Sequence, residues 1–220
     1  DIERAQEAVG AGAPQVEKLR PFFNHPLFVA ANADRVRTAL AEFSAADRER
    51  VHVVYTAHSI PLSMSNQCDY ACQLEDIYRL VSEAVGVPRE RWSIAYQSRS
   101  GRPEDPWLDP DILDHLQALS QRGVSHVLIA PVGFLSDHME VLYDLDVEAR
   151  DRAAEIGLKL VRAQTVGTHP LFVQMIRELI AERLSGTSER AAVGTFPARP
   201  DMCAADCCPA PRRPARPGSA

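Results

Sequence analysis

The chain has 220 residues, of which 45% are hydrophobic and 25% are charged, a balance typical of a folded globular protein. Its 24 basic and 30 acidic side chains give a formal charge of -6, which argues against nucleic acid and anionic membrane surfaces as partners. No apolar run is long enough to span a bilayer, and the first residues do not form a signal peptide, so we expect a cytoplasmic protein. The sequence begins without methionine and inside a helical pattern, from which we expect that upstream sequence has been lost.

Short β-rich runs alternate with amphipathic helical patterns along the chain. We expect strands at residues 51–57, 92–97, 126–132 and 158–163, and helices near residues 70–86, 110–122, 138–157 and 169–184. Strands that alternate with helices form βαβ units, in which the strands run parallel. The sequence therefore predicts an α/β fold built on a parallel sheet.

A weak repeat relates two segments, NHPLFVAANADRV at residues 24–36 and THPLFVQMIRELI at residues 168–180. Each copy opens a helix, and we expect His25 and His169 to serve the two helix starts. A duplicated α/β half-domain produces such a repeat, and chance identity is the alternative interpretation. Two similar lobes are therefore one possible architecture.

Residues 186–220 are rich in Pro, Ala and Arg and show no periodicity, so we expect a flexible, extended or disordered tail. Three of the five cysteines lie in it, Cys203, Cys207 and Cys208. Their thiolates suit iron–sulfur or zinc, but a site with four ligands needs one more residue.

His58 follows the buried-type strand in VVYTAHSIP and is the first candidate for chemistry. Ligands of open parallel sheets bind beyond the carboxyl ends of the strands, which is where His58 is expected to lie. The alternative is a structural histidine that is satisfied by a backbone hydrogen bond. Because the G-x-S-x-G pattern is absent, His58 and Ser59 do not indicate acyl transfer.

The second candidate is the acidic row in FLSDHMEVLYDLDVE, where Glu140, Asp144 and Glu148 are spaced four residues apart on one helical face. Such oxygen ligands suit a divalent cation, whereas like charges at this spacing only repel each other on a solvated helix. The spacing alone leaves a ligand row and a solvated polar face about equal.

Other residues of this helix have simpler interpretations. We expect Ser136 or Asp137 to cap its start, Arg152 to pair with Glu148 one turn later, and Asp146 to be an ordinary solvated acid on another face.

A long loop, YQSRSGRPEDPWLDPD, carries Arg99, Arg102 and Trp107. Guanidinium groups and an indole face suit a flat anionic ligand. A surface loop that is anchored by one buried tryptophan is the alternative.

Three of these stretches occur in the same order in the ferrochelatases: VVYTAHSIP at residues 53–61, YQSRSGRPEDPWLDPD at 96–111 and APVGFLSDHMEVLYDLDVE at 130–148. The chain resembles this family, which inserts ferrous iron into a porphyrin, over residues 1–185. The resemblance implies two Rossmann-like lobes with the porphyrin cleft between them. The implied boundaries are 1–43 for the end of the first lobe and a crossover helix, 44–168 for the C-terminal lobe, 169–185 for a helix that returns to the first lobe, and 186–220 for the tail.

The resemblance also implies roles for single residues. His58 corresponds to the histidine that accepts the pyrrole protons, and Glu140 corresponds to the essential acid of the following helix. With Asp144 and Glu148 these two residues are the implied ligands for the metal or carriers of protons. The implied substrate contacts are Trp107 and Phe134 at the porphyrin faces, His138 in the same motif, and Arg99 or Arg102 at the propionates.

The tail resembles that of actinobacterial members, which hold a 2Fe-2S cluster on three C-terminal cysteines and a fourth from the first lobe. Cys203, Cys207 and Cys208 are then implied ligands, with the fourth upstream of Asp1. These members act on coproporphyrin III, so the implied substrates are Fe2+ and that porphyrin, with transient contacts to other heme-pathway enzymes. We expect little or no activity from these residues alone. The alternatives are a sirohydrochlorin cobalt or nickel chelatase and a non-catalytic metal or iron–sulfur binding fragment.

Overall fold

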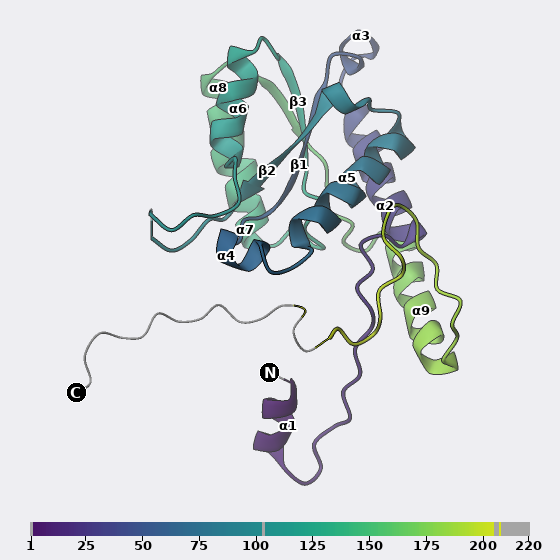
Figure 1. The fold of residues 1–220 in the computed structure, drawn as a ribbon. Helices are drawn as coiled ribbons and strands as arrows, with labels where there is room; N and C mark the ends of the chain where they lie inside the picture. The colour runs from purple at the N-terminus through teal and green to yellow at the C-terminus, as the bar shows by residue number, and fades with distance from the viewer. Residues whose placement is uncertain (1, 103, 205–206, 208–220) are drawn as a thin grey trace, which may run out of the picture.

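The fold is built on one parallel sheet of four strands (Figure 1). The computed structural model describes residues 2–102, 104–204 and 207. The strands are β1 (His52–His58), β2 (Trp92–Gln97), β3 (His126–Ala130) and β4 (Lys159–Arg162), in the order β2-β1-β3-β4. All neighbouring strands pair in parallel. The predicted α/β fold with a parallel sheet is confirmed.

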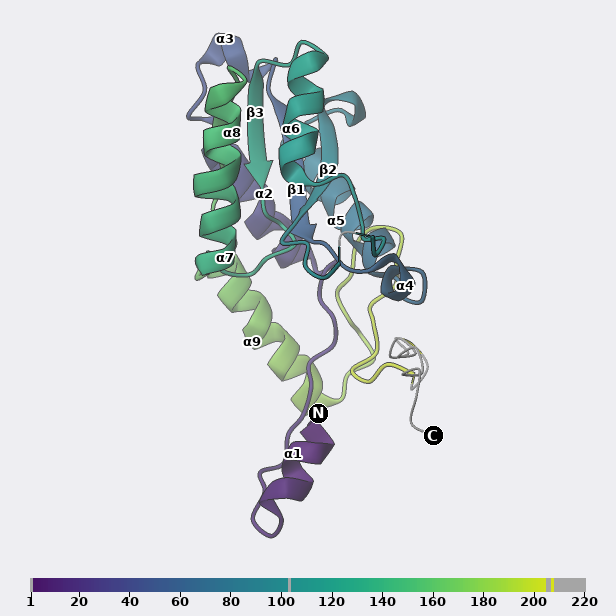
Figure 2. The same cartoon turned by 90° about the vertical axis from the view of Figure 1, so that its left-hand side faces the viewer.

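Helices cover both faces of this sheet (Figures 1 and 2). The helices of the described residues are α1 (Ile2–Val9), which lies apart from the sheet, α2 (Pro26–Leu40), α3 (Ala45–Arg48), α4 (Leu62–Ser65), α5 (Tyr70–Val85), η1 (Arg89–Arg91), α6 (Ile112–Gln121), α7 (Met139–Val141), η2 (Leu142–Ala149), α8 (Arg150–Glu155) and α9 (Pro170–Ser185). One apolar core joins the sheet to α2, α5 and α9, and a second joins it to α6 and the continuous helix α7–η2–α8. Within the described parts of the chain, no helix combines the length and apolar character that crossing a membrane requires.

Strand β1 lies in the middle of the sheet, and its sequence explains why. Val53, Tyr55 and Ala57 pack into the core on the α2–α5 side, whereas Val54 packs into the core on the α6 side. A strand that is buried on both faces needs an uninterrupted apolar run, which VHVVYTA supplies. His58 is the first residue of the run whose side chain reaches solvent, because it lies where the strand leaves the core.

The HPLFV repeat forms two helices that pack together, α2 and α9. His25 and His169 are their N-caps, and each Nδ1 accepts the backbone N–H two residues later at 3.2 Å. The other ring nitrogens cross between the helices, with Nε2 of His25 3.7 Å from Glu178 and Nε2 of His169 3.0 Å from Asp34. The expected role at the helix starts is confirmed. Within the described residues the repeat covers these two helices beside a single sheet, and the duplication of half-domains stays a prediction.

Residues 190–201 run extended along α2 and α5 and are held by buried polar groups. Asn24 donates from Nδ2 to the Phe196 carbonyl at 2.8 Å, and Thr195 donates from its hydroxyl to Asp76 at 2.9 Å. Asn24 and Asp76 are 0% and 4% exposed, so each needs a partner within the protein. This segment is therefore extended and anchored by these contacts, and the flexibility of the tail stays a prediction.

Candidate active site

The carboxyl ends of β1 and β2 meet the turn that follows β3. His58 and Gln97, the last residues of β1 and β2, are paired in register. The turn approaches β1 at Gly133, whose N–H donates to the Thr56 carbonyl at 3.0 Å. A Cβ atom on Gly133 would lie 2.7 Å from the Ala57 Cα and closer still to the Ala57 Cβ, so only glycine allows this approach. The turn then leads into α7, which brings Glu140 to the same edge.

His58 faces Glu140 across this edge. Its Nε2 lies 3.6 Å from Glu140 Oε1, and the two side chains are 39% and 49% exposed, so a ligand can reach both. The Nδ1 atom is hydrogen bonded to the Ser59 carbonyl, which can only accept, so Nδ1 carries the proton. In the neutral ring Nε2 therefore presents its lone pair toward Glu140. Tyr70 also donates from its hydroxyl to the His58 carbonyl at 2.9 Å, which fixes the backbone.

The acidic row does not form one set of ligands. Asp144 turns to the end of β2 and the residue that follows it, where Gln97 donates from Nε2 to its Oδ2 at 3.0 Å and the Ser98 hydroxyl donates to the same oxygen. Glu148 lines a separate cavity of about 190 Å³ together with Asp111 and Asp144. Among the described residues no three His, Cys, Asp or Glu side chains gather around a common metal position. Of the four residues expected to bind metal, only His58 and Glu140 face each other directly in the structure, and the full set stays a prediction.

Three carboxylates, Asp111, Asp144 and Glu148, make the lining of this cavity acidic. Burial, and then the charges of Asp114 and Asp144, raise the pKa of Asp111 above its usual value. Asp111 also accepts the Leu113 N–H at 2.9 Å as the N-cap of α6. A carboxyl group with a raised pKa can exchange protons closer to neutral pH than an ordinary one.

The helix that carries the row is wound as a π-helix over Leu142–Ala149, whereas the sequence predicted an α-helix throughout 138–157. In a π-helix the backbone hydrogen bonds run from i to i+5, and such turns are frequent at functional sites. Periodicity could not reveal this winding, because residues four apart stay close to one face in either geometry.

Phe134 and His138 pack against each other at the start of this helix. Their rings lie 5.6 Å apart at 69°, and Phe134 is 7% exposed within the apolar core. His138 is the N-cap of α7, with Nδ1 accepting the Val141 N–H at 3.5 Å. The expectation that Ser136 or Asp137 caps the helix is wrong. Phe134 thus supports the ring of His138 from the apolar core, and its expected contact with a porphyrin face stays a prediction.

Arg162 of β4 was not singled out from the sequence, yet it fixes two acids of this region. It donates to Asp146 Oδ2 at 2.8 Å and to Asp137 Oδ1 at 2.8 Å, and its side chain is 13% exposed. Asp146 is therefore paired and not simply solvated. Arg152 bonds to side chains of α6 and α8, so its expected pairing with Glu148 is wrong.

The loop after β2 brings Trp107 next to the segment that follows His58. Trp107 forms an isolated antiparallel bridge with Pro61 and is half-buried. Arg99 lines the small acidic cavity and donates to the Asp105 carbonyl at 2.8 Å, while Arg102 is exposed. The loop thus offers an indole and two guanidinium groups near the carboxyl edge.

The cysteines of the tail lie elsewhere. Cys203 is exposed and Cys207 is half-buried, while Cys208 lies outside the described residues. Cys203 and Cys207 line a cavity of about 340 Å³ with Lys18 and Met202. No third Cys, His, Asp or Glu among the described residues joins them as a metal ligand.

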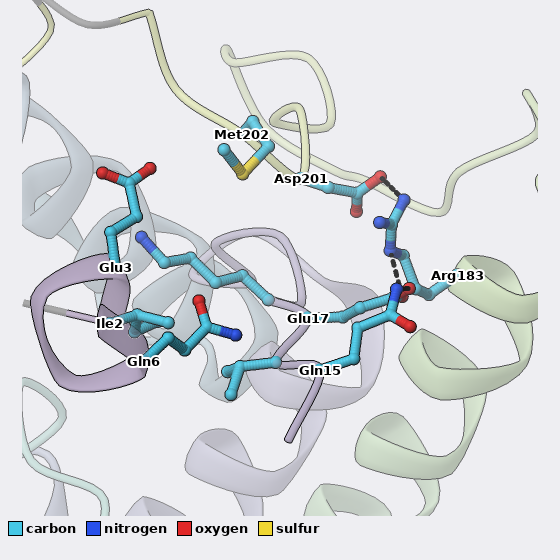
Figure 3. A pocket seen from close by; sticks show the side chains of 10 residues that line it. Ile2, Glu3, Gln6, Gln15, Glu17, Arg183, Asp201 and Met202 are labelled. Atoms are coloured by element: carbon cyan, nitrogen blue, oxygen red, sulfur yellow. Dashed lines mark hydrogen bonds and ion pairs between the residues drawn. The ribbon is translucent and has the colours of Figure 1, made fainter. Parts of the chain in front are cut away.

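A larger cavity, of about 430 Å³, lies next to these thiols, between α1, the end of α9 and the tail (Figure 3). Arg183 contacts Glu17 at 2.9 Å and Asp201 at 3.7 Å across it. None of the residues at the carboxyl edge lines this cavity, so its size does not mark the site of chemistry.

Comparison with known proteins gives a consistent set of matches. The ferrochelatase family model matches residues 1–184. A ferrochelatase of Rhodopirellula baltica is 48% identical over 216 residues, which cover 97% of this chain and 61% of that protein. Coproporphyrin III ferrochelatases of Nocardia farcinica and Streptomyces griseus are 45% and 44% identical, covering 99% and 94% of this chain and 65% and 60% of their own length. A solved multi-domain protein of Deinococcus radiodurans is described as structurally similar to chelatases. Its match to this chain covers 77% of this chain and 32% of that protein, with a TM-score of 0.47 and 20% sequence identity. The chain therefore spans about three fifths of the length of the curated relatives it matches.

Proposed function

Because the chain belongs to the ferrochelatase family, we propose that it carries the metal-insertion site of an enzyme that places ferrous iron in coproporphyrin III. The resemblance seen in the three sequence motifs is confirmed at the level of the family. The observation that carries the proposal is the contact between His58 and Glu140 at the carboxyl edge of the sheet. Two relatives that are named coproporphyrin III ferrochelatases support the choice of porphyrin.

His58 acts as the proton acceptor in this proposal. Insertion of one divalent ion releases two pyrrole protons, so the charge of the macrocycle complex stays balanced. The hydrogen bond from Nδ1 to the Ser59 carbonyl leaves the Nε2 lone pair free to take one proton at a time. Glu140, 3.6 Å away, stabilises the imidazolium that forms.

The same pair also suits a metal ion on its way to the porphyrin. A nitrogen and an oxygen that each bind an ion at about 2.1 Å, with a tetrahedral angle between them, lie about 3.4 Å apart. The observed 3.6 Å is close to this value. Two protein ligands are fewer than stable sites use, so the ion stays available for transfer to the pyrrole nitrogens.

The surrounding groups have supporting roles. Asp144, Glu148 and Asp111 take protons away from the pair through the small acidic cavity that they line. Trp107 forms a wall for the flat macrocycle, with His138 at the start of α7. Arg99 and Arg102 of the same loop meet the propionates.

A chimera tests this proposal on an active background. Residues 1–184 replace the matching segment of the Nocardia farcinica ferrochelatase, and loss of coproporphyrin III fluorescence on anaerobic addition of Fe2+ measures metal insertion. We expect turnover from the chimera and at least a 100-fold loss in His58→Ala, roughly the low end for removal of a general acid–base group.

The matched control is His126→Ala, at the opposite end of the sheet, where the ring contacts Asp47 at 3.6 Å. This variant should turn over close to the unsubstituted chimera. Circular dichroism checks that each chimera is folded, and quenching of coproporphyrin fluorescence without metal measures substrate binding. A folded chimera that binds porphyrin without turning it over, or turnover that survives His58→Ala, contradicts the proposal.

The proposed reaction does not depend on the expected iron–sulfur cluster, location or partner enzymes. A 2Fe-2S cluster takes four cysteine ligands, and the described thiols of the tail, Cys203 and Cys207, do not make such a set. No part of the proposed reaction is therefore given to a cluster. A cytoplasmic location and transient contacts with heme-pathway enzymes stay predictions. No described residue favours the sirohydrochlorin chelatase or the non-catalytic fragment.

A further inference from the structure

Gln97 is a buried amide directly beside the proposed proton acceptor. It is paired in register with His58 and is 1% exposed. Its Nε2 donates to Asp144 Oδ2 at 3.0 Å, and the Ser98 hydroxyl donates to the same oxygen. Two donors that converge on one oxygen fix the direction in which the Asp144 carboxylate points.

Asp144 and Glu140 are neighbours on one helix but have different partners. Residues four apart on a helix are about 5–6 Å apart at Cβ, and adjacent strands are about 4.8 Å apart. His58 on β1 therefore reaches Glu140, while Gln97 on β2 reaches Asp144 one turn later. The Asp144 carboxylate therefore lies one helical turn from Glu140 and is turned toward Gln97 and Ser98.

We propose that Gln97 and Ser98 are positioning residues that hold Asp144 away from the His58–Glu140 pair and so keep the site at two protein ligands. The inference rests on the proposed function, because a third protein ligand would retain an ion that a chelatase must release.

The chemistry of the two donors suits this role. An amide and a hydroxyl are neutral, so they orient the carboxylate without adding a charge that would repel an incoming cation. The amide oxygen of Gln97 is buried and accepts no hydrogen bond from the described residues, so the bond to Asp144 is what orients the amide.

Calorimetric titration of the 220-residue chain with Co2+ tests the inference. Gln97→Met removes the donor but keeps the length of a buried side chain. We expect Co2+ to bind about tenfold more tightly, which is about 1.4 kcal/mol, because the released Asp144 becomes a third ligand. A variant with a damaged fold would bind Co2+ more weakly, so tighter binding cannot be explained by such damage. Ser98→Ala should give a smaller gain in the same direction.

Two further variants make the result specific. In Gln97→Met combined with Asp144→Asn the gain should disappear, because the two residues act through one contact. Gln117→Met makes the same change in α6, outside the pair and the acidic cavity, and should leave Co2+ affinity unaltered.

The outcomes separate the inference from the proposed function on which it rests. Suppose first that His58→Ala weakens Co2+ binding, as the proposed function requires. The inference alone is then overturned if folded Gln97→Met and Ser98→Ala bind Co2+ no more tightly than the unsubstituted chain. It is also overturned if the gain in affinity persists in the double variant. If His58→Ala binds Co2+ as tightly as the unsubstituted chain, the metal pair is wrong and the inference falls with it.

Discussion

Gly133 holds the turn after β3 against the end of β1, and a single added methyl group tests this contact. In Gly133→Ala the new Cβ would lie 2.7 Å from the Ala57 Cα and 3.0 Å from the Thr56 oxygen, whereas ordinary contacts are 3.4–4 Å. Both neighbours are backbone atoms, so the turn or the strand must shift by several tenths of an ångström. Overpacking costs about 1–3 kcal/mol, and we expect about 2 kcal/mol here.

The same shift reaches the candidate active site, because Ala57 precedes His58 and the turn leads to Glu140. Chemical denaturation measures the loss of stability, and Co2+ calorimetry should show about tenfold weaker binding. Gly123→Ala is the control, since its φ of +82° strains a side chain while no atom lies within 4 Å. It should cost about 1 kcal/mol and leave Co2+ binding unaltered. Unchanged stability and affinity in Gly133→Ala would refute the argument that this close approach positions His58.

Two further predictions concern charged groups outside the pair. Burial, followed by the charges of His115 and nearby arginines, lowers the pKa of His52 from 6.5 to about 4. As the pH falls through this range the unfolded chain gains a proton that the folded chain does not, so stability should fall by about 3 kcal/mol at about 1.4 kcal/mol per pKa unit. Denaturation at several pH values measures this slope, which should be smaller in His52→Gln; an equal slope contradicts the assignment. Arg162→Met leaves Asp146 unpaired and should cost about 2 kcal/mol in thermal unfolding, whereas Arg152→Met, with an exposed partner, should cost under about 0.5 kcal/mol. Equal losses in the two arginine variants would argue against a special role for Arg162.

The sheet and its helices could be predicted because their signals are local. The apolar run before His58 and the turn residues between elements place all four strands within two residues of their observed bounds. The histidines of the repeat could likewise be assigned to helix starts, since a cap and its helix are adjacent in sequence.

The partners within the site could not be predicted, because they come from distant segments. Gln97 and Asp144 are 47 residues apart, and Arg162 and Asp146 are 16 apart. Spacing along one helix groups Glu140 with Asp144, but the neighbouring strand ends give each a different partner. The observed arrangement is neither a row of ligands nor a solvated face. Glu140 faces His58, and Asp144 accepts hydrogen bonds from Gln97 and Ser98.

We expect His58 and Glu140 to bind the incoming metal ion. Crystals of the chain soaked in Co2+, which stands in for air-sensitive ferrous iron, test it through an anomalous difference map at the cobalt absorption edge. We predict one strong peak between His58 Nε2 and Glu140 Oε1, which is lost in crystals of His58→Ala. Cobalt bound at another site, with no peak at this pair, would contradict the claim.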